Sequence, residues 1–123
     1  MYSIHEVSKK TGLTDHTLRY YEKVGILVDI SRTQGGVRQY SDADLESLNL
    51  ICCLKNTGMP LQEISRFLEL TRKGDRTLKE RVELLRAHRE IVRDQMKETK
   101  KYLDKVTQKL DIFSEKLREY EER

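Results

Sequence analysis

Thr17-Leu18-Arg19-Tyr20-Tyr21-Glu22 is the stretch that decides the fold. Read as a helix, it places Leu18 and Tyr21 on one face and Arg19 and Tyr20 on another. The first face can pack against a core, whereas the second can contact phosphates and base edges. A shorter helical segment and a glycine turn precede this stretch, so the whole predicts a helix-turn-helix.

Capping signals define the two helices around that turn. Ser3 and Glu6 form a capping box for a first helix, which Gly12 is expected to end. Thr14 is expected to cap the second helix, which should run to about Val24.

Residues 26–40 change to a strand-like pattern. The β-branched Val28, Ile30 and Val37 and the Gly35-Gly36 turn signal predict a two-stranded hairpin, in which the register of the first strand is left open. Arg38 and Tyr40 stand two residues apart, so we expect them to project from one face of the second strand.

Two further helices follow the hairpin. Ser41 and Asp44 form a second capping box, Gly58 ends the third helix, and Pro60 suits the first turn of the fourth. Each helix carries an apolar stripe at helical spacing. The stripes are Leu45, Leu48, Ile51, Cys52 and Leu54, then Leu61, Ile64, Phe67 and Leu68.

A long helix is predicted from a third capping box, Thr77-Leu78-Lys79-Glu80, almost to Arg123, because no glycine or proline interrupts it. Thirteen positions step by alternating four and three residues, and eleven of them are apolar. Such a heptad pattern predicts a coiled coil about 65 Å long. The simplest partner that would bury its apolar seam is a second copy of the chain in a two-fold dimer. The positions are Leu78, Val82, Leu85, Arg89, Val92, Met96, Thr99, Leu103, Val106, Leu110, Phe113, Leu117 and Tyr120.

Composition narrows the function without deciding it. The net charge of +3 is too small to indicate nucleic-acid binding by itself, but residues 9–38 hold six Lys or Arg against three Asp or Glu. The long helix carries thirteen basic against eleven acidic residues from position 79 on, which is typical of a solvated coiled-coil face. No membrane span or signal peptide is recognisable, so a cytoplasmic protein is expected. No catalytic set, metal-ligand spacing or cofactor motif is present, and an enzyme is not expected.

The order of these elements resembles the MerR family of bacterial transcription regulators. The resemblance spans about residues 3 to 70, and the long helix takes the family's dimerisation position. It lies in Ile4, Val7, Thr11-Gly12-Leu13-Thr14, Thr17-Leu18-Arg19-Tyr20-Tyr21-Glu22, Gly25-Ile26-Leu27, Arg38-Gln39-Tyr40, Asp44-Leu45, Leu54-Lys55, Gly58-Met59-Pro60-Leu61 and Ile64.

The resemblance implies a mostly α fold. A winged helix-turn-helix DNA-binding domain (1–75) would be followed by a dimerisation helix (76–123) that forms an antiparallel coiled coil. It also implies a homodimer on double-stranded promoter DNA that distorts the DNA centre and acts on RNA polymerase indirectly. The resemblance also gives seven positions a role in DNA binding. The first group contacts DNA from the recognition helix, the second is a wing contact with an aromatic residue that supports it, and the third contacts phosphates from the second helix pair. In that order they are Arg19, Tyr20 and Thr17, then Arg38 with Tyr40, then Lys55 and the backbone around Leu61.

Cys53 is a candidate thiol sensor. The family's short AdhR- and NmlR-like members carry a cysteine late in the third helix, with aldehyde or nitrosative stress as the proposed signal, and Cys53 occupies the matching place. Burial as ordinary packing is the competing interpretation, and it is the preferred one for Cys52. His5 and His16 are expected to be surface residues rather than ligands.

Two alternatives stay open beside the stress-responsive regulator. One is a ligand-independent or protein-regulated repressor, similar to the glutamine-synthetase repressors of the MerR superfamily. The other is a coiled-coil adaptor that does not bind DNA. The sequence decides neither activation against repression, nor the signal, nor the operator.

Overall fold

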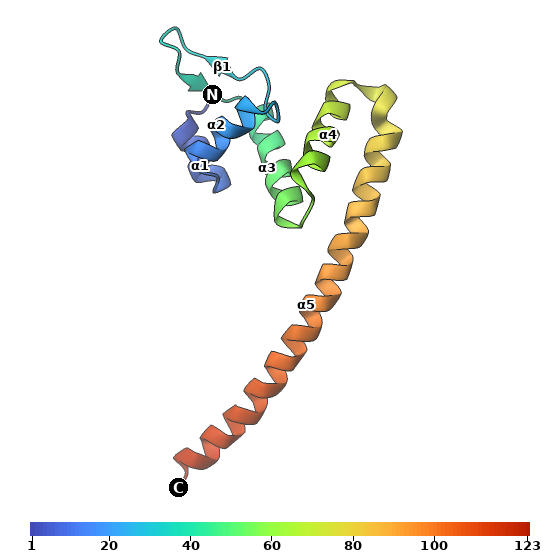
Figure 1. Cartoon of the computed structure of the whole chain (residues 1–123). Coiled ribbons are helices and arrows are strands. Elements are labelled where there is room, and N and C mark those ends of the chain that lie inside the picture. The colour runs from blue at the N-terminus through green and yellow to red at the C-terminus, as the bar shows by residue number, and fades with distance from the viewer. The chain divides into compact units, whose positions relative to one another are not determined.

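The computed structural model describes all 123 residues, and the protein is mostly helical with a small two-stranded wing (Figure 1). The chain divides into two units, Met1–Val82 and Glu83–Arg123. We call the first the DNA-reading unit, after the role that the sequence predicts for it, and the second the helical unit. In order, the elements are α1 Ile4–Thr11, α2 Asp15–Lys23, β1 Ser31–Arg32, β2 Arg38–Gln39, α3 Asp42–Asn56, α4 Leu61–Arg72, the short 3-10 helix η1 Asp75–Thr77, and α5 Leu78–Glu121.

The helix-turn-helix forms as the sequence predicts. The Ser3 hydroxyl accepts the Glu6 amide while the Glu6 carboxylate accepts the Ser3 amide, so the first capping box is confirmed. Gly12 ends α1 with a φ of 77°, a left-handed conformation that favours glycine. The Thr14 hydroxyl then accepts the Thr17 amide and caps α2.

The hairpin is shorter than expected. Its strands pair antiparallel over only two residues each, with Ser31 opposite Gln39 and Arg32 opposite Arg38. Val28 lies outside the first strand and is exposed, because the backbone turns at Asp29, whose φ is 57°. The predicted two-stranded hairpin is therefore confirmed, but Val28, Ile30 and Val37 lie outside its strands.

Tyr40 belongs to a different pairing from the one expected. Its amide and carbonyl exchange two hydrogen bonds of 2.8 Å with Tyr2, so the end of the hairpin is fastened to the residues before α1. The Tyr2 hydroxyl also donates to Asp42 at the start of α3. Tyr40 is consequently buried in the core, whereas Arg38 keeps part of its side chain open to solvent.

The third and fourth helices close the core of the DNA-reading unit. Ser41 and Asp44 form the predicted capping box of α3, whereas Pro60 lies at the N-cap of α4 rather than in its first turn. The helix α3 contacts both α1 and α4. Most of the predicted stripe residues are buried, and the fully enclosed side chains come from all four helices and the end of the hairpin. They are Val7, Leu18, Tyr21, Tyr40, Leu48, Ile51 and Ile64.

The start of α5 lacks the predicted capping box. The Thr77 hydroxyl donates to the carbonyls of Leu70 and Gly74, and the Glu80 carboxylate pairs with Arg66 at 3.2 Å. Both side chains of the proposed box are thus engaged by α4 and the turn after it. The predicted long helix itself is confirmed, since α5 runs for 44 residues without a break.

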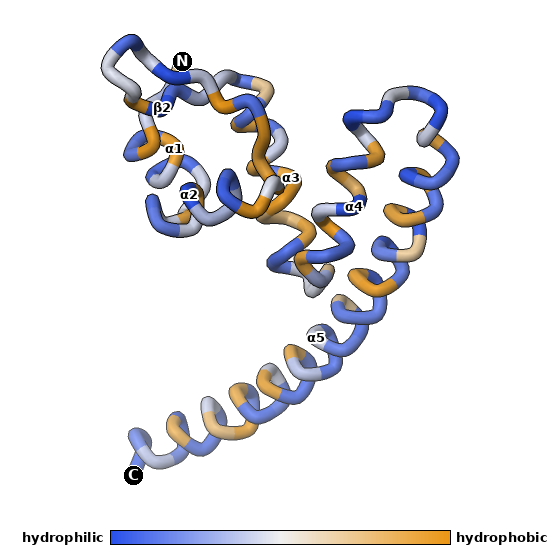
Figure 2. Tube along the Cα trace, turned by 45° about the horizontal axis from the view of Figure 1, so that its top comes forward, coloured by the Kyte–Doolittle hydropathy of each residue, from blue (hydrophilic) through white to orange (hydrophobic).

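The helical unit has no core of its own. Figure 2 shows apolar positions recurring along α5 among polar ones, as the heptad pattern requires. These side chains are open to solvent in the single chain: Leu103 is 61% exposed, Phe113 59% and Tyr120 72%. Between them, ion pairs such as Lys100–Asp104 and Arg93–Glu90 make the mixed-charge surface expected from the sequence. No helix in the structure is long and apolar enough to cross a membrane.

Candidate DNA-binding surface

The helix α2 separates its packing side chains from its exposed ones, as the opening stretch predicts. Leu18 and Tyr21 are buried, whereas Arg19 and Tyr20 are exposed. Tyr20 keeps 46% of its surface open while its ring lies 6.4 Å from that of Tyr21. The exposed pair therefore offers a guanidinium and an amphipathic ring on a rigid helix.

Thr17 is placed differently from these two residues. Its hydroxyl lies 2.9 Å from the hydroxyl of Thr14, within the cap of α2, and the residue is half-buried. Any DNA contact through Thr17 would share this hydroxyl with the cap.

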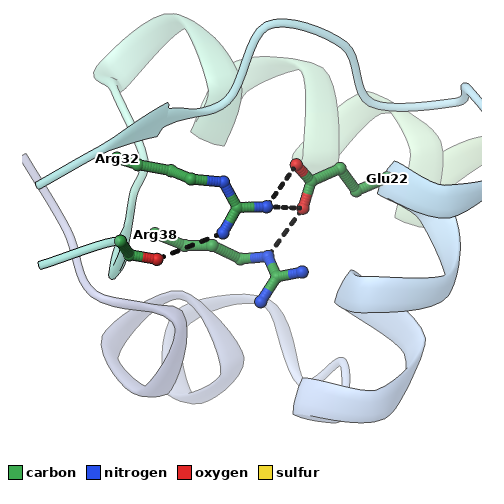
Figure 3. A network of polar contacts seen from close by, with 4 residues as sticks. Glu22, Arg32 and Arg38 are labelled. Atoms are coloured by element: carbon green, nitrogen blue, oxygen red, sulfur yellow. Dashed lines mark hydrogen bonds and ion pairs between the residues drawn. The ribbon is translucent and has the colours of Figure 1, made fainter.

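The wing is tied to α2 through one carboxylate (Figure 3). Arg38 Nε donates to Glu22 Oε1 at 2.6 Å, and Arg32 Nη2 donates to Glu22 Oε2 at 3.1 Å. The second terminal nitrogen of Arg32 donates to the Gly36 carbonyl at the hairpin turn. Since Glu22 is the last acidic residue of α2, these contacts join the end of that helix to both strands of the hairpin.

Tyr40 is fully buried and lies close enough to this group of charges to feel them. Burial raises the pKa of its phenol, while the neighbouring charge of Arg38 acts in the opposite direction. Its hydroxyl is enclosed without a hydrogen-bond partner. Its side chain has no open surface with which to contact DNA directly. Its expected role in supporting the wing remains a prediction.

The second helix pair approaches the same region. The Lys55 ammonium lies 5.9 Å from the centre of the Tyr21 ring, so α3 brings a cation beside α2. No side chain caps the first amides of α4, which begins at Leu61. Leu61 and Tyr20 line the same surface hollow. An uncapped helix N-terminus suits a phosphate, so this arrangement supports the expected backbone contact.

The two cysteines differ in exposure. Cys53 is exposed on α3 and Cys52 is half-buried, and both are free thiols. Burial raises the pKa of Cys52, an effect that the charge of Lys55 only partly offsets. Cys52 therefore behaves as a packing residue, while Cys53 is accessible to reagents. His5 and His16 are both exposed, as expected.

The structure groups most of the predicted positions but adds two that sequence reasoning missed. Arg19 and Tyr20 lie on α2, which Glu22 joins to Arg38 of the wing, and Lys55 of α3 lies over the Tyr21 ring. Glu22 and Arg32 were not expected to take part. The sequence pattern that could have indicated them is an acidic residue near the end of a helix, followed by a hairpin with one arginine in each strand. This pattern is common, and only the folded structure shows that the three side chains meet. No group of three or more His, Cys, Asp or Glu side chains is arranged to hold a metal ion.

Comparison with known families gives two overlapping matches. The model described as MerR HTH family regulatory protein matches residues 2–71, and the one described as MerR, DNA binding, matches residues 45–120. Together they cover both units of the chain.

Individual relatives agree with this result. An HTH-type transcriptional regulator of Haemophilus influenzae is 41% identical over 112 residues, which are 91% of this chain and 83% of the relative. The HTH-type transcriptional regulator AdhR of Bacillus subtilis is 35% identical over 88 residues, 72% of this chain and 63% of AdhR.

Solved structures show the same fold. HiNmlR, a MerR family regulator lacking the sensor domain, was crystallised bound to promoter DNA. It is 43% identical, with a TM-score of 0.79, over 84% of this chain and 78% of HiNmlR. A MerR family regulator from Bacillus thuringiensis is 37% identical, also with a TM-score of 0.79, over 89% of this chain and 96% of that one.

Proposed function

Because the chain belongs to the MerR family and is a DNA-binding transcriptional regulator rather than an enzyme, we propose that it acts in the cytoplasm as a homodimer that distorts promoter DNA. The adaptor that does not bind DNA is thereby set aside. The observation that carries the proposal is the surface of the DNA-reading unit, where Arg19 and Tyr20 are exposed on α2 beside the arginines of the wing.

The arrangement supports contacts of two kinds. Arg19 and Tyr20 on α2 suit the major groove, as the second helix of a helix-turn-helix does. Arg38 on the wing, Lys55 and the first amides of α4 suit phosphates, which fix the protein on the duplex. Two copies joined through α5 would set two such surfaces at a fixed separation, and that separation would determine the half-site spacing.

Arg19→Ala tests the recognition helix. We expect about tenfold or greater loss of affinity for a duplex selected from a random library by the unmodified protein, because an arginine contact to a base or phosphate is lost. Arg93→Ala is the matched control, since Arg93 is exposed on α5 and pairs only with Glu90. Anisotropy titrations at several salt concentrations give the affinities. Equal affinities for the two variants would refute the assignment of Arg19.

Promoter distortion is the proposed route to RNA polymerase. If the regulator changes the phase of the two promoter elements, its effect on transcription must depend on the length of DNA between them. Transcription in vitro from promoters lengthened and shortened one base pair at a time measures this dependence. An effect that is the same at every length would contradict distortion and favour simple blocking of the promoter.

We also propose that an aldehyde, oxidative or nitrosative signal acts through Cys53. Its exposed position on α3, in the chain segment that leads to the phosphate-facing start of α4, supports this. Cys53→Ser should abolish the response of a promoter to formaldehyde or to a nitrosothiol while leaving operator affinity unchanged. Cys52→Ser, the neighbouring half-buried thiol, is the control and should respond as the unmodified protein does. A normal response by Cys53→Ser would exclude thiol sensing at this position.

A further inference from the structure

We propose that Glu22 is a positioning residue that raises operator specificity: it holds Arg38 of the wing ready for one DNA geometry and lowers the affinity for DNA in general. This inference rests on the proposed function, because it takes the wing to contact DNA. A carboxylate is unexpected on a surface that faces phosphates, since both groups are negatively charged, and this role would explain its presence there.

The contacts of Arg38 leave its terminal nitrogens available. Only Nε is bonded, through its 2.6 Å hydrogen bond to Glu22 Oε1. Neither Nη atom is joined to another residue in Figure 3. The Nε contact fixes the plane of the guanidinium, so the two terminal N–H groups are presented as a fork of the kind that binds a phosphate bidentately.

Arg32 has the opposite pattern of contacts. Its Nη2 donates to Glu22 and its Nη1 donates to the Gly36 carbonyl at 3.3 Å, so both terminal nitrogens already have protein partners. Arg32 therefore connects the hairpin turn to Glu22, and Arg38 is the arginine of the pair with free donors. The two arginines flank the same carboxylate but have separate tasks.

Stability alone does not account for Glu22. Its side chain is 21% exposed, and those of Arg38 and Arg32 are 26% and 43% exposed, so all three charges are partly removed from water and the cost of desolvation offsets their attraction. A partly buried ion pair is therefore weak evidence for a contribution to stability. General DNA affinity does not account for Glu22 either, because a carboxylate between two guanidinium groups reduces their attraction for any phosphate.

Orientation is what the carboxylate can supply. A free arginine side chain loses conformational freedom when it is immobilised on binding, and that loss weakens the complex. In this protein Glu22 has already ordered Arg38 before DNA arrives. The benefit is realised only on a duplex whose phosphates match the held orientation, whereas the repulsion applies to every duplex. The ratio of operator to non-operator affinity therefore rises.

The main experiment compares Glu22→Gln with Asp29→Asn, two substitutions that each remove one negative charge. Asp29 is exposed in the segment before β1, and asparagine tolerates its φ of 57°. Anisotropy titrations use a duplex selected by the unmodified protein and a scrambled duplex of equal length. We expect Glu22→Gln to bind the scrambled duplex about 3-fold more tightly, with a steeper salt dependence, and to lose about 5- to 10-fold in the ratio of the two affinities. Asp29→Asn should change both affinities in parallel.

Glu22→Asp separates charge from reach. It keeps the carboxylate but withdraws it by one methylene group, which is enough to lose the 2.6 Å contact. We expect weaker operator binding with no gain on the scrambled duplex. A ratio equal to that of the unmodified protein in both Glu22 variants would overturn the proposal, as would a parallel fall in both affinities that tracks a lower melting temperature.

Two further measurements keep the inference separate from the proposed function and from folding. Arg38→Ala should lose operator affinity. If it does not, the wing contact itself is wrong, whereas a normal Glu22→Gln beside a weakened Arg38→Ala refutes only the role of Glu22. In the unmodified protein, the Arg38 Nε–H signal in NMR spectra should exchange slowly with water both free and bound to DNA. Rapid exchange in the free protein would refute the held orientation even if a variant did not fold.

Discussion

The two units of this chain use apolar residues in opposite ways. The DNA-reading unit encloses seven side chains almost completely, including two tyrosines, within the first 82 residues. The helical unit leaves the apolar stripe of α5 exposed to water along its length. Because burial of apolar surface is the main source of stability, the first unit can be stable by itself and the second requires a partner molecule.

The largest effect is expected from substitutions that disrupt self-association through the exposed stripe of α5. The double substitution Leu103→Glu and Leu110→Glu would place four carboxylates in the seam between two copies. We expect the dimer to be lost and operator affinity to fall about 1,000-fold, because two linked surfaces bind far more tightly than one. Sedimentation velocity and anisotropy titrations measure the two effects.

Ile112→Glu is the control for that variant. Ile112 is also exposed on α5 but lies outside the heptad positions, so the same change of side chain should leave self-association intact. Circular dichroism should show a folded DNA-reading unit in both proteins. A double variant that still sediments as a dimer would contradict the proposed coiled-coil seam.

Shortening an apolar side chain should give the next largest effect. The two units should differ in whether the resulting loss of stability depends on protein concentration. Leu48 has no exposed surface, so Leu48→Ala leaves a cavity and should cost about 2–5 kcal/mol of unfolding free energy. That loss should be independent of protein concentration. Leu103→Ala, at an exposed stripe position, should instead change stability only through the dimer, so that its effect shrinks as the protein is diluted toward the monomer. Urea titrations at two protein concentrations measure both.

Helix capping should have a smaller effect. The nine-residue helix α2 depends on its cap, whereas the 44-residue α5 can lose a local interaction without consequence. Thr14→Ala removes the acceptor of the Thr17 amide and should cost about 1 kcal/mol of stability. Thr107→Ala in the middle of α5 is the control and should leave the melting temperature of the DNA-reading unit unchanged. Equal losses in thermal melts of the two variants would contradict this difference between the helices.

The smallest effect concerns a hydroxyl inside the core. The Tyr40 hydroxyl is buried without a hydrogen-bond partner, so Tyr40→Phe should leave stability unchanged or raise it by up to about 1 kcal/mol. A clear loss of stability in chemical denaturation would show that the hydroxyl has a partner, such as an enclosed water. Operator affinity should not change, since the ring still fills the same place.

Local signals in the sequence were sufficient for the helices. The capping boxes at Ser3 and Ser41 and the apolar stripes depend on residues three and four apart, and the structure confirms them. The predicted capping box at Thr77 does not form, because the two side chains make other contacts. Thr77 donates to the carbonyls of Leu70 and Gly74, and Glu80 pairs with Arg66. A spacing rule cannot detect such competition.

The hairpin was harder to predict for the same reason. Alternation along a strand placed Arg38 and Tyr40 on one face, but β2 ends at Gln39 and Tyr40 pairs with Tyr2, which is 38 residues earlier in the sequence. The contacts of Glu22 could likewise not be predicted from local sequence patterns, since its partners are 10 and 16 residues away in the chain. Interactions between distant residues therefore limited the prediction of the site more than that of the fold.

The pairing of Tyr2 with Tyr40 has a practical consequence for experiments on this protein. The residues before α1 are held against the end of the wing and, through the Tyr2 hydroxyl, against the first turn of α3. An affinity tag or fluorescent protein fused directly ahead of Tyr2 would crowd that junction and disturb the wing. A handle attached after Arg123 leaves it untouched, and a flexible spacer is needed wherever a label must be carried at the amino end.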